Sequence, residues 1–148
     1  MDWLNLPGLM MVVALLAPNL LYALKRHGSL RRRGQESRLW TALEQLGRFG
    51  CMALMCVHTG VWDFGYASEA WRIVWLSVGM TILCAYCLVW VFHFRRESRI
   101  TALSLALLPT LLFLLSGLAW RNVPLMAFSL LFGAAHTVVS LQNVPPQA

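Results

Sequence analysis

Charged side chains are scarce in this chain and are absent from long stretches of it. Of its 148 residues only 12% are charged, whereas 59% are hydrophobic and the mean hydropathy is +0.63. Soluble domains carry about twice that charged fraction. The shortage of charge therefore excludes an ordinary soluble domain and indicates a single multi-pass membrane domain over residues 1–148.

Sequence motifs of familiar enzymes are missing as well. The chain contains no GxSxG, HExxH, phosphate-binding loop or dinucleotide fingerprint, so none of those chemistries is indicated. All four cysteines lie in apolar stretches, which excludes an extracellular disulfide framework. The histidines lie at unequal depths, which does not suit a pair that ligates haem. We expect no cofactor and no bound metal ion.

Basic residues, by contrast, are concentrated in two short segments. Nine of the 12 Lys and Arg residues lie in residues 25–38 and 95–99. Basic loops of membrane proteins face the cytoplasm, where they also contact anionic lipid headgroups. Topology therefore explains the net charge of +6, and nucleic acid is not expected as a partner.

Five apolar segments are long enough, at about 20 residues each, to cross a bilayer. They are residues 4–24, 39–62, 71–92, 101–120 and 125–144. With both basic segments inside, the sequence predicts an all-α bundle of five transmembrane helices, with its N-terminus outside and its C-terminus in the cytoplasm. An aromatic belt is then expected at the outer interface, formed by Trp3, Trp62, Tyr66, Trp71, Trp75 and Trp120.

Polar residues enter the second apolar segment along one helical face, spaced 4, 3, 4, 3 and 4 apart: Glu44, Arg48, Cys51, Met55, His58 and Trp62. Glu44 precedes Arg48 by four residues, the favourable order for an ion pair within a helix. Charged residues inside membrane segments usually face the bundle interior and indicate a functional site. The alternative is an amphipathic lead-in at the cytoplasmic surface, with lipid entered only near Phe49.

A second polar face follows the fifth apolar segment, with spacing 4, 3, 4 and 3: Ser129, Gly133, His136, Ser140 and Asn143. Small residues allow another helix to approach closely, and polar ones bond across the contact. We expect His136 to lie near Glu44 and Arg48. Ordinary small-residue packing is the alternative and explains the glycine and the serines equally well.

Two proline-containing phrases resemble each other. "PNLLYAL" at 18–24 and "PTLLFLL" at 109–115 share the pattern P-[NT]-L-L-[FY]-x-L, and the predicted topology runs them in opposite directions. Each proline removes a backbone hydrogen bond, and Asn19 supplies an amide beside the first. Proline-broken helices in inverted halves point to a transporter binding site. Chance similarity between leucine-rich segments is the alternative.

The third apolar segment carries two further patterns. Tyr86, Trp90, His93 and Glu97 form a stripe towards the predicted cytoplasmic side, which we interpret as an interfacial girdle of aromatic and charged residues. "CAYC" at 84–87 has the spacing of thiol redox and metal sites. Its predicted depth near mid-membrane makes thiol chemistry the minor alternative.

Four phrases together resemble a group of small, functionally unassigned five-helix membrane proteins of Gram-positive bacteria: "APNLLYA", "LEQLGRFGC", "LPTLLFLLSG" and "AAHTVVSLQN". The resemblance covers nearly the whole chain. It implies a five-helix protein of the bacterial cytoplasmic membrane and assigns no catalytic residue.

These patterns predict a ligand site between the first, second and fifth helices, formed by Asn19, Glu44, Arg48, His136, Ser140 and Asn143. The predicted function is binding or transport of a small anionic or zwitterionic solute, with Arg48 supplying charge. Alternatives are a membrane enzyme acting on a lipid or isoprenoid, with Glu44 or His136 as base, and a non-catalytic subunit of a membrane complex. Five helices alone are scarcely enough to surround a solute pathway across the membrane. A transporter of this size is therefore expected to form a homodimer or bind a membrane partner.

The predicted topology is testable by cysteine labelling. Residues 25–38 and 93–100 are expected in the cytoplasm, and residues 63–70 and 121–124 outside. An impermeant thiol reagent added to intact cells should modify a cysteine placed at Ser68 and leave one at Ser29 unmodified. The reverse labelling pattern would contradict the orientation.

Overall fold

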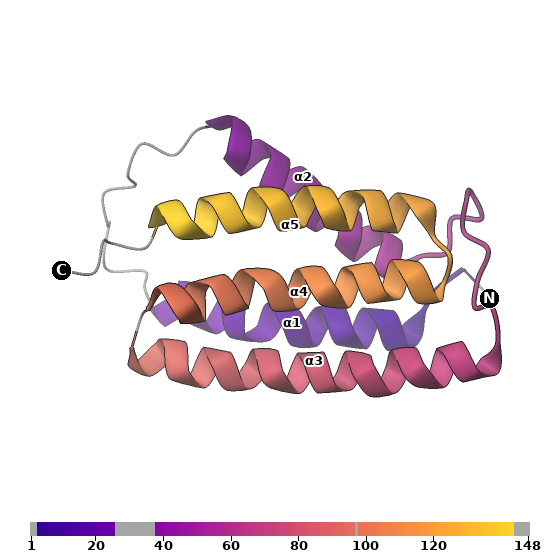
Figure 1. The fold of residues 1–148 in the computed structure, drawn as a ribbon, viewed down its shortest axis with the longest axis horizontal. Coiled ribbons are helices and arrows are strands. Elements are labelled where there is room, and N and C mark those ends of the chain that lie inside the picture. Colours follow the sequence, from indigo (N-terminus) through magenta and orange to yellow (C-terminus); the bar gives the residue numbers. More distant parts are fainter. Residues whose placement is uncertain (1–2, 26–37, 97, 144–148) are drawn as a thin grey trace.

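The computed structural model describes residues 3–25, 38–96 and 98–143, and this part of the chain is helical apart from connecting turns and two isolated β-bridges. The helices are α1 (Leu6–Lys25), α2 (Arg38–Cys56), α3 (Glu69–Arg95), α4 (Arg99–Ala119) and α5 (Val123–Asn143). Consecutive helices run in opposite directions, with α2 oblique to the other four (Figure 1). The predicted all-α fold of five helices is confirmed.

Four of the five helices have the length and composition of membrane spans. They are α1, α3, α4 and α5, and they fit a multi-pass membrane protein as the sequence predicts. Helix α2 is not among them, because its 19 residues include the charged Arg38, Glu44 and Arg48. By length and composition, the prediction of five spanning segments therefore holds for four helices and not for α2.

Helix α2 also ends earlier than predicted. The sequence predicts a helix to residue 62, but α2 stops at Cys56, where the chain pairs with the residues that precede α1. Cys56 accepts a backbone hydrogen bond from Asn5 at 2.8 Å, and the His58 N–H donates to the carbonyl of Trp3 at 2.8 Å. These bonds use groups that would otherwise extend the helix. His58 and Trp62 therefore do not belong to the helical face predicted for Glu44 and Arg48.

The five helices contact one another in a closed ring, in the order α2, α5, α4, α3, α1 and back to α2. Helix α5 packs extensively on both α2 and α4, whereas α1 makes the smaller contacts that close the ring. Helix α1 meets α2 at Gly8, where an added Cβ would lie 2.2 Å from the carbonyl oxygen of Met55. The side chains enclosed by the ring include Met11, Cys51, Met55, Trp75, Leu112 and Phe132.

Glycines allow α2 and α5 to pack backbone against backbone. A Cβ on Gly47 would lie 2.8 Å from both the backbone nitrogen and Cα of Phe132, and one on Gly50 would lie 2.5 Å from the Phe128 ring. Real Cβ atoms essentially never approach other atoms so closely, so a side chain at Gly47 would have to displace the α5 backbone, and one at Gly50 would have to displace the Phe128 ring. The α2–α5 contact therefore depends on small residues, as in close-packed helix pairs of membrane proteins.

The two ends of the bundle differ in construction. We call residues 3–5, 57–68 and 120–122 the loop end, and the opposite end, where α1, α3 and α5 finish, the basic end (Figure 1). At the loop end, Asp63 forms a bridge with Asn122. The Val123 N–H donates to the carbonyl of Trp62 at 3.1 Å, and Arg121 donates to the carbonyl of Phe64 at 3.0 Å. Backbone bonds thus join three separate connections at the loop end.

The predicted aromatic belt is wrong for two of its six residues. Trp3, Trp62 and Trp71 are exposed, but Trp75 and Trp120 are fully buried in the bundle, their ring centroids 5.1 Å apart. The indole N–H of Trp75 donates to the Ser116 hydroxyl at 2.8 Å. A hydrogen-bonded indole can be buried at little cost, which explains why Trp75 is a core residue and not an interfacial one.

Substitution of Gly47 tests the close contact between α2 and α5. Gly47→Ala places a methyl group against the Phe132 backbone, which cannot move without shifting α5. We expect a loss of about 1–3 kcal/mol in unfolding free energy, measured by thermal denaturation in detergent. Gly79→Ala is the matched control, because its Cβ would meet only the mobile ends of Leu112 and Met11 at 3.3 Å. Equal losses in the two variants would contradict a rigid α2–α5 contact.

Candidate functional site

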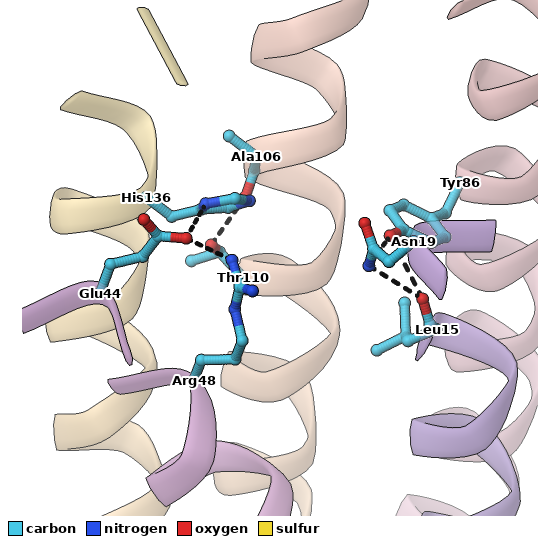
Figure 2. A network of polar contacts seen from close by, with 8 residues as sticks. All are labelled: Leu15, Asn19, Glu44, Arg48, Tyr86, Ala106, Thr110 and His136. Carbon is cyan, nitrogen blue, oxygen red and sulfur yellow. Dashed lines mark hydrogen bonds and ion pairs between the residues drawn. The ribbon is translucent and has the colours of Figure 1, made fainter. Parts of the chain in front are cut away.

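A buried carboxylate between α2 and α5 is bound by two basic side chains. The Glu44 side chain is 6% exposed, and one of its oxygens, Oε1, contacts both Arg48 Nη2 and His136 Nδ1. The distance from Oε1 to His136 Nδ1 is 3.0 Å. We call Glu44, Arg48 and His136 the Glu44 cluster; Figure 2 shows the three side chains converging on that oxygen. Their predicted proximity is confirmed.

The helix geometry explains why these residues meet. Glu44 and Arg48 lie on one face of α2 because they are four residues apart. The contact between Gly47 and Phe132 sets the register of α2 against the antiparallel α5. From that contact, one turn back along α2 reaches Glu44 and one turn forward along α5 reaches His136. The close helix contact therefore positions the carboxylate beside the imidazole.

Phe132 supports both basic side chains of the cluster. The His136 ring stacks on the Phe132 ring, with centroids 4.8 Å apart and an interplanar angle of 16°. The Arg48 guanidinium carbon lies 5.9 Å from the Phe132 centroid, within the range of a cation–π contact. Phe132 itself is 3% exposed. A fixed aromatic ring thus restricts the orientation of the imidazole and the guanidinium.

Exposure differs sharply within the Glu44 cluster. The Arg48 side chain is 34% exposed and that of His136 is 19% exposed, compared with 6% for Glu44. Arg48 therefore combines a buried acceptor on one side with an accessible surface on the other. A guanidinium carries five N–H donors, so the bond to Glu44 leaves donors for a further anionic group.

Helix α4 forms the neighbouring wall of the cluster. Thr110 directly follows Pro109, and its hydroxyl donates to the carbonyl of Ala106 at 2.9 Å. The Thr110 methyl group packs against Gly133, where an added Cβ would lie 2.4 Å away. Since Gly133 precedes His136 by about one helical turn, Thr110 lies beside the imidazole, as Figure 2 shows.

Asn19 belongs to a different polar group. Its amide nitrogen donates to the carbonyl of Leu15 at 3.2 Å and to the Tyr86 hydroxyl at 2.8 Å. The Tyr86 hydroxyl in turn lies 3.3 Å from the same Leu15 carbonyl. In Figure 2 this group stands apart from the Glu44 cluster, with α4 between them in the view. The structure thus does not bring Asn19 into contact with the predicted charged pair.

The two remaining predicted site residues follow His136 along α5. Ser140 is half-buried one turn beyond it. The side chain of Asn143 lies outside the described part of the chain, as does Glu97 of the third-segment stripe. Ser129, at the other end of the α5 face, is buried and donates to the carbonyl of Met126 at 2.8 Å.

Tyr86 was missed as a site residue. The interpretation of Tyr86 and Trp90 as an interfacial girdle is wrong, because both are buried in the bundle, at 1% and 6% exposure. The four-residue spacing of the two aromatics was the available signal, because such spacing equally describes a face that packs inward. Tyr86 is the residue of α3 that bonds to the polar side chain next to Pro18.

The two proline phrases make the same local arrangement. In α1 the residue after Pro18 donates its side chain to the carbonyl four residues earlier, and in α4 the residue after Pro109 does likewise. The acceptors are Leu15 and Ala106, and Figure 2 includes both bonds. Helices α1 and α4 run in opposite directions, as predicted (Figure 1). The sequence similarity therefore has a structural counterpart.

A second histidine–carboxylate pair lies at the loop end. His58 Nδ1 is 2.9 Å from Asp63 Oδ2, and the Asp63 side chain is 2% exposed. The backbone N–H of Gly65 contacts the other Asp63 oxygen at 3.4 Å. Nearby, burial raises the pKa of the Tyr66 hydroxyl above its usual value. These contacts organise the 57–68 connection.

The "CAYC" pair lies apart from the Glu44 cluster. Cys84 and Cys87 are exposed on α3, on the opposite side of α4 from the Glu44 cluster in the ring of helices. Within residues 3–25, 38–96 and 98–143, no three side chains of His, Cys, Asp or Glu gather as metal ligands do. The Glu44 cluster is thus the better candidate for chemistry.

Comparison of the chain with protein-family models, with curated proteins and with solved structures finds no match. The candidate site therefore rests on its own geometry.

Removing one charge of the Glu44–Arg48 pair should be worse than removing both. Arg48→Gln leaves a buried carboxylate without its cation, and Glu44→Gln removes the negative charge that Arg48 and His136 contact. We expect each single change to cost about 1–3 kcal/mol and the double change less. Thermal denaturation of the four proteins in detergent measures this. Silent single changes would place the pair at an exposed surface, in agreement with the amphipathic lead-in.

Proposed function

We propose that this chain is a multi-pass membrane protein that binds a small anionic solute at the Glu44 cluster and carries it across the membrane. The main support for this proposal is the buried Glu44 carboxylate, whose two partners are a partly accessible arginine and a histidine. Buried charged groups in membrane bundles serve ion and solute pathways. A purely structural pair needs neither an exposed guanidinium nor a second basic partner.

Chain connectivity supports five membrane crossings. Helices α1 and α3 have the composition of membrane spans and run in the same direction along the bundle (Figure 1). The chain between them must return from the basic end to the loop end, and α2 makes that passage. Oblique α2 can include the buried Glu44 because α5 packs against α2 and supplies His136 as a partner. We therefore place the N-terminus outside and the C-terminus in the cytoplasm, with the basic end inward.

The exposed side of Arg48 favours an anion as ligand. Guanidinium groups bind carboxylates and phosphates through paired, charge-assisted hydrogen bonds. The cation–π contact with Phe132 restricts the Arg48 head group, which lowers the entropy cost of binding. His136 and Thr110 add polar groups around the same position.

The matched proline phrases agree with a transporter. Inverted repeats with interrupted helices place substrate sites near the centre of many transporter folds. Here Asn19 and Thr110 occupy equivalent places after Pro18 and Pro109 in antiparallel helices. The location proposed for the chain is a bacterial plasma membrane, as the sequence resemblance to proteins of Gram-positive bacteria implies. A homodimer or a membrane partner would complete the path, and anionic lipid headgroups would contact the basic end.

A membrane enzyme is the second candidate, and one contact favours it. Glu44 engages His136 at Nδ1, which orients the ring and leaves Nε2 as a general base, as in catalytic histidine–carboxylate pairs. Arg48 would then bind the anionic head of a lipid or isoprenoid substrate. Formation of a product from such a substrate would select this alternative.

Anion binding by the purified protein tests the proposed function. We suggest thermal denaturation in detergent with acetate, lactate, nitrate and phosphate, each at fixed ionic strength. An anion at ten times its Kd should raise Tm by about 3–6 °C. The effect should disappear in Arg48→Gln and persist in Arg72→Gln, whose arginine pairs with Glu69 on the exposed start of α3. Equal Tm shifts in the two variants would contradict binding at Arg48.

A further inference from the structure

We infer that binding of a monoanion at the Glu44 cluster is coupled to uptake of one proton by His136. This inference rests on the proposed function and adds the coupling ion. Arg48 and His136 share a single Glu44 oxygen, Oε1. Both basic groups balance the charge of the same carboxylate oxygen. When one of them is drawn to another anion, the carboxylate depends more on the other.

The charges around His136 can be counted completely for the helices that pack on α5. Those helices are α2 and α4. Helix α2 presents Glu44 and Arg48, and it begins with Arg38; the only charged residue of α4 is Arg99 at its first position. Within Val123–Asn143, His136 is the only ionisable side chain. With a neutral imidazole, Glu44 and Arg48 therefore compensate each other and the cluster has no net charge.

An anion on Arg48 disturbs that balance. A carboxylate or nitrate bound to the guanidinium competes with Glu44 for its positive charge, and the Glu44 carboxylate is almost fully buried. A buried carboxylate deprived of its cation is strongly destabilised. The imidazole is already in contact with that carboxylate at 3.0 Å. Protonation of the His136 imidazole would place a replacement cation next to the carboxylate without moving either side chain.

The proton and charge balance is simple. The proposal assigns to the empty cluster a neutral His136, whose Nδ1–H donates to Glu44 and whose Nε2 has a free electron pair. On binding, a proton from water adds to Nε2 and gives an imidazolium. Two pairs then exist, Glu44 with His136 and Arg48 with the anion, so one anion and one proton enter together. The loaded cluster is as neutral as the empty one, which favours its passage through a low-dielectric interior.

The coupling predicts how the affinity for the anion depends on pH. Because the complex holds one more proton than the free protein, binding must tighten as pH falls, by linkage. The apparent affinity for the anion should therefore rise as pH falls, and it should not depend on pH in a protein that takes up no proton.

Proton uptake can be measured directly on the full chain in detergent. Acetate, lactate and nitrate are titrated into lightly buffered protein at pH 7.5 with an indicator dye, while binding is followed by calorimetry. We expect about one proton taken up for each anion bound. His136→Gln keeps a polar side chain beside Glu44 and should bind without proton uptake and without pH dependence. His58→Gln, which changes the pair at the loop end, should retain uptake.

The outcomes separate the coupling from the proposed function. Anion binding by the unchanged protein without proton uptake overturns the coupling and leaves the anion site standing. Proton uptake that persists in His136→Gln overturns the role of His136. Absence of binding by all three anions overturns both proposals. The measurement on the unchanged protein decides the main question even if the His136 variant fails to fold.

Discussion

The contact between the α2 and α5 backbones is the constraint from which the rest of the site follows. Gly47 lies against Phe132 so closely that no side chain fits between them. This approach covers one face of α2, so that a helix with three charges can pack in an otherwise apolar bundle. It also sets the register that brings Glu44 to His136. Without this contact the Glu44 carboxylate would lack His136 as its second partner, and α2 would lose its largest contact with the other helices.

Phe132 has a double role in this arrangement. Its backbone receives Gly47, while its ring lies against His136 and near Arg48. The residue that allows the helices to meet is therefore also the surface on which the basic groups are ordered. A change at Phe132 would alter packing and site geometry together, whereas Thr110 on α4 packs against Gly133, about one turn before His136.

Much of this structure could be predicted from local spacing. The length of the five apolar segments predicts five helices. A four-residue spacing predicts the Glu44–Arg48 pair, because neighbours along a helix face are fixed by its geometry. The contact with His136 followed from matching faces on two helices. The end of α2 was not predictable in this way, because it depends on pairing with Trp3 and Asn5, some 50 residues away. Burial of Trp75 likewise depends on Ser116, a partner on another helix.

The loop end has a mechanical consequence for the whole bundle. Backbone bonds tie the start of α1 to the end of α2, and the 57–68 connection to the turn before α5. A helix of 20 residues is about 30 Å long, so rotating it by about 5° around a fixed end displaces the other end by roughly 3 Å. A rotation of a helix about the loop end therefore produces its largest displacement at the basic end. Helix α1 has the weakest lateral contacts with its neighbours. A small rotation of α1 at the loop end would therefore displace its other end most easily.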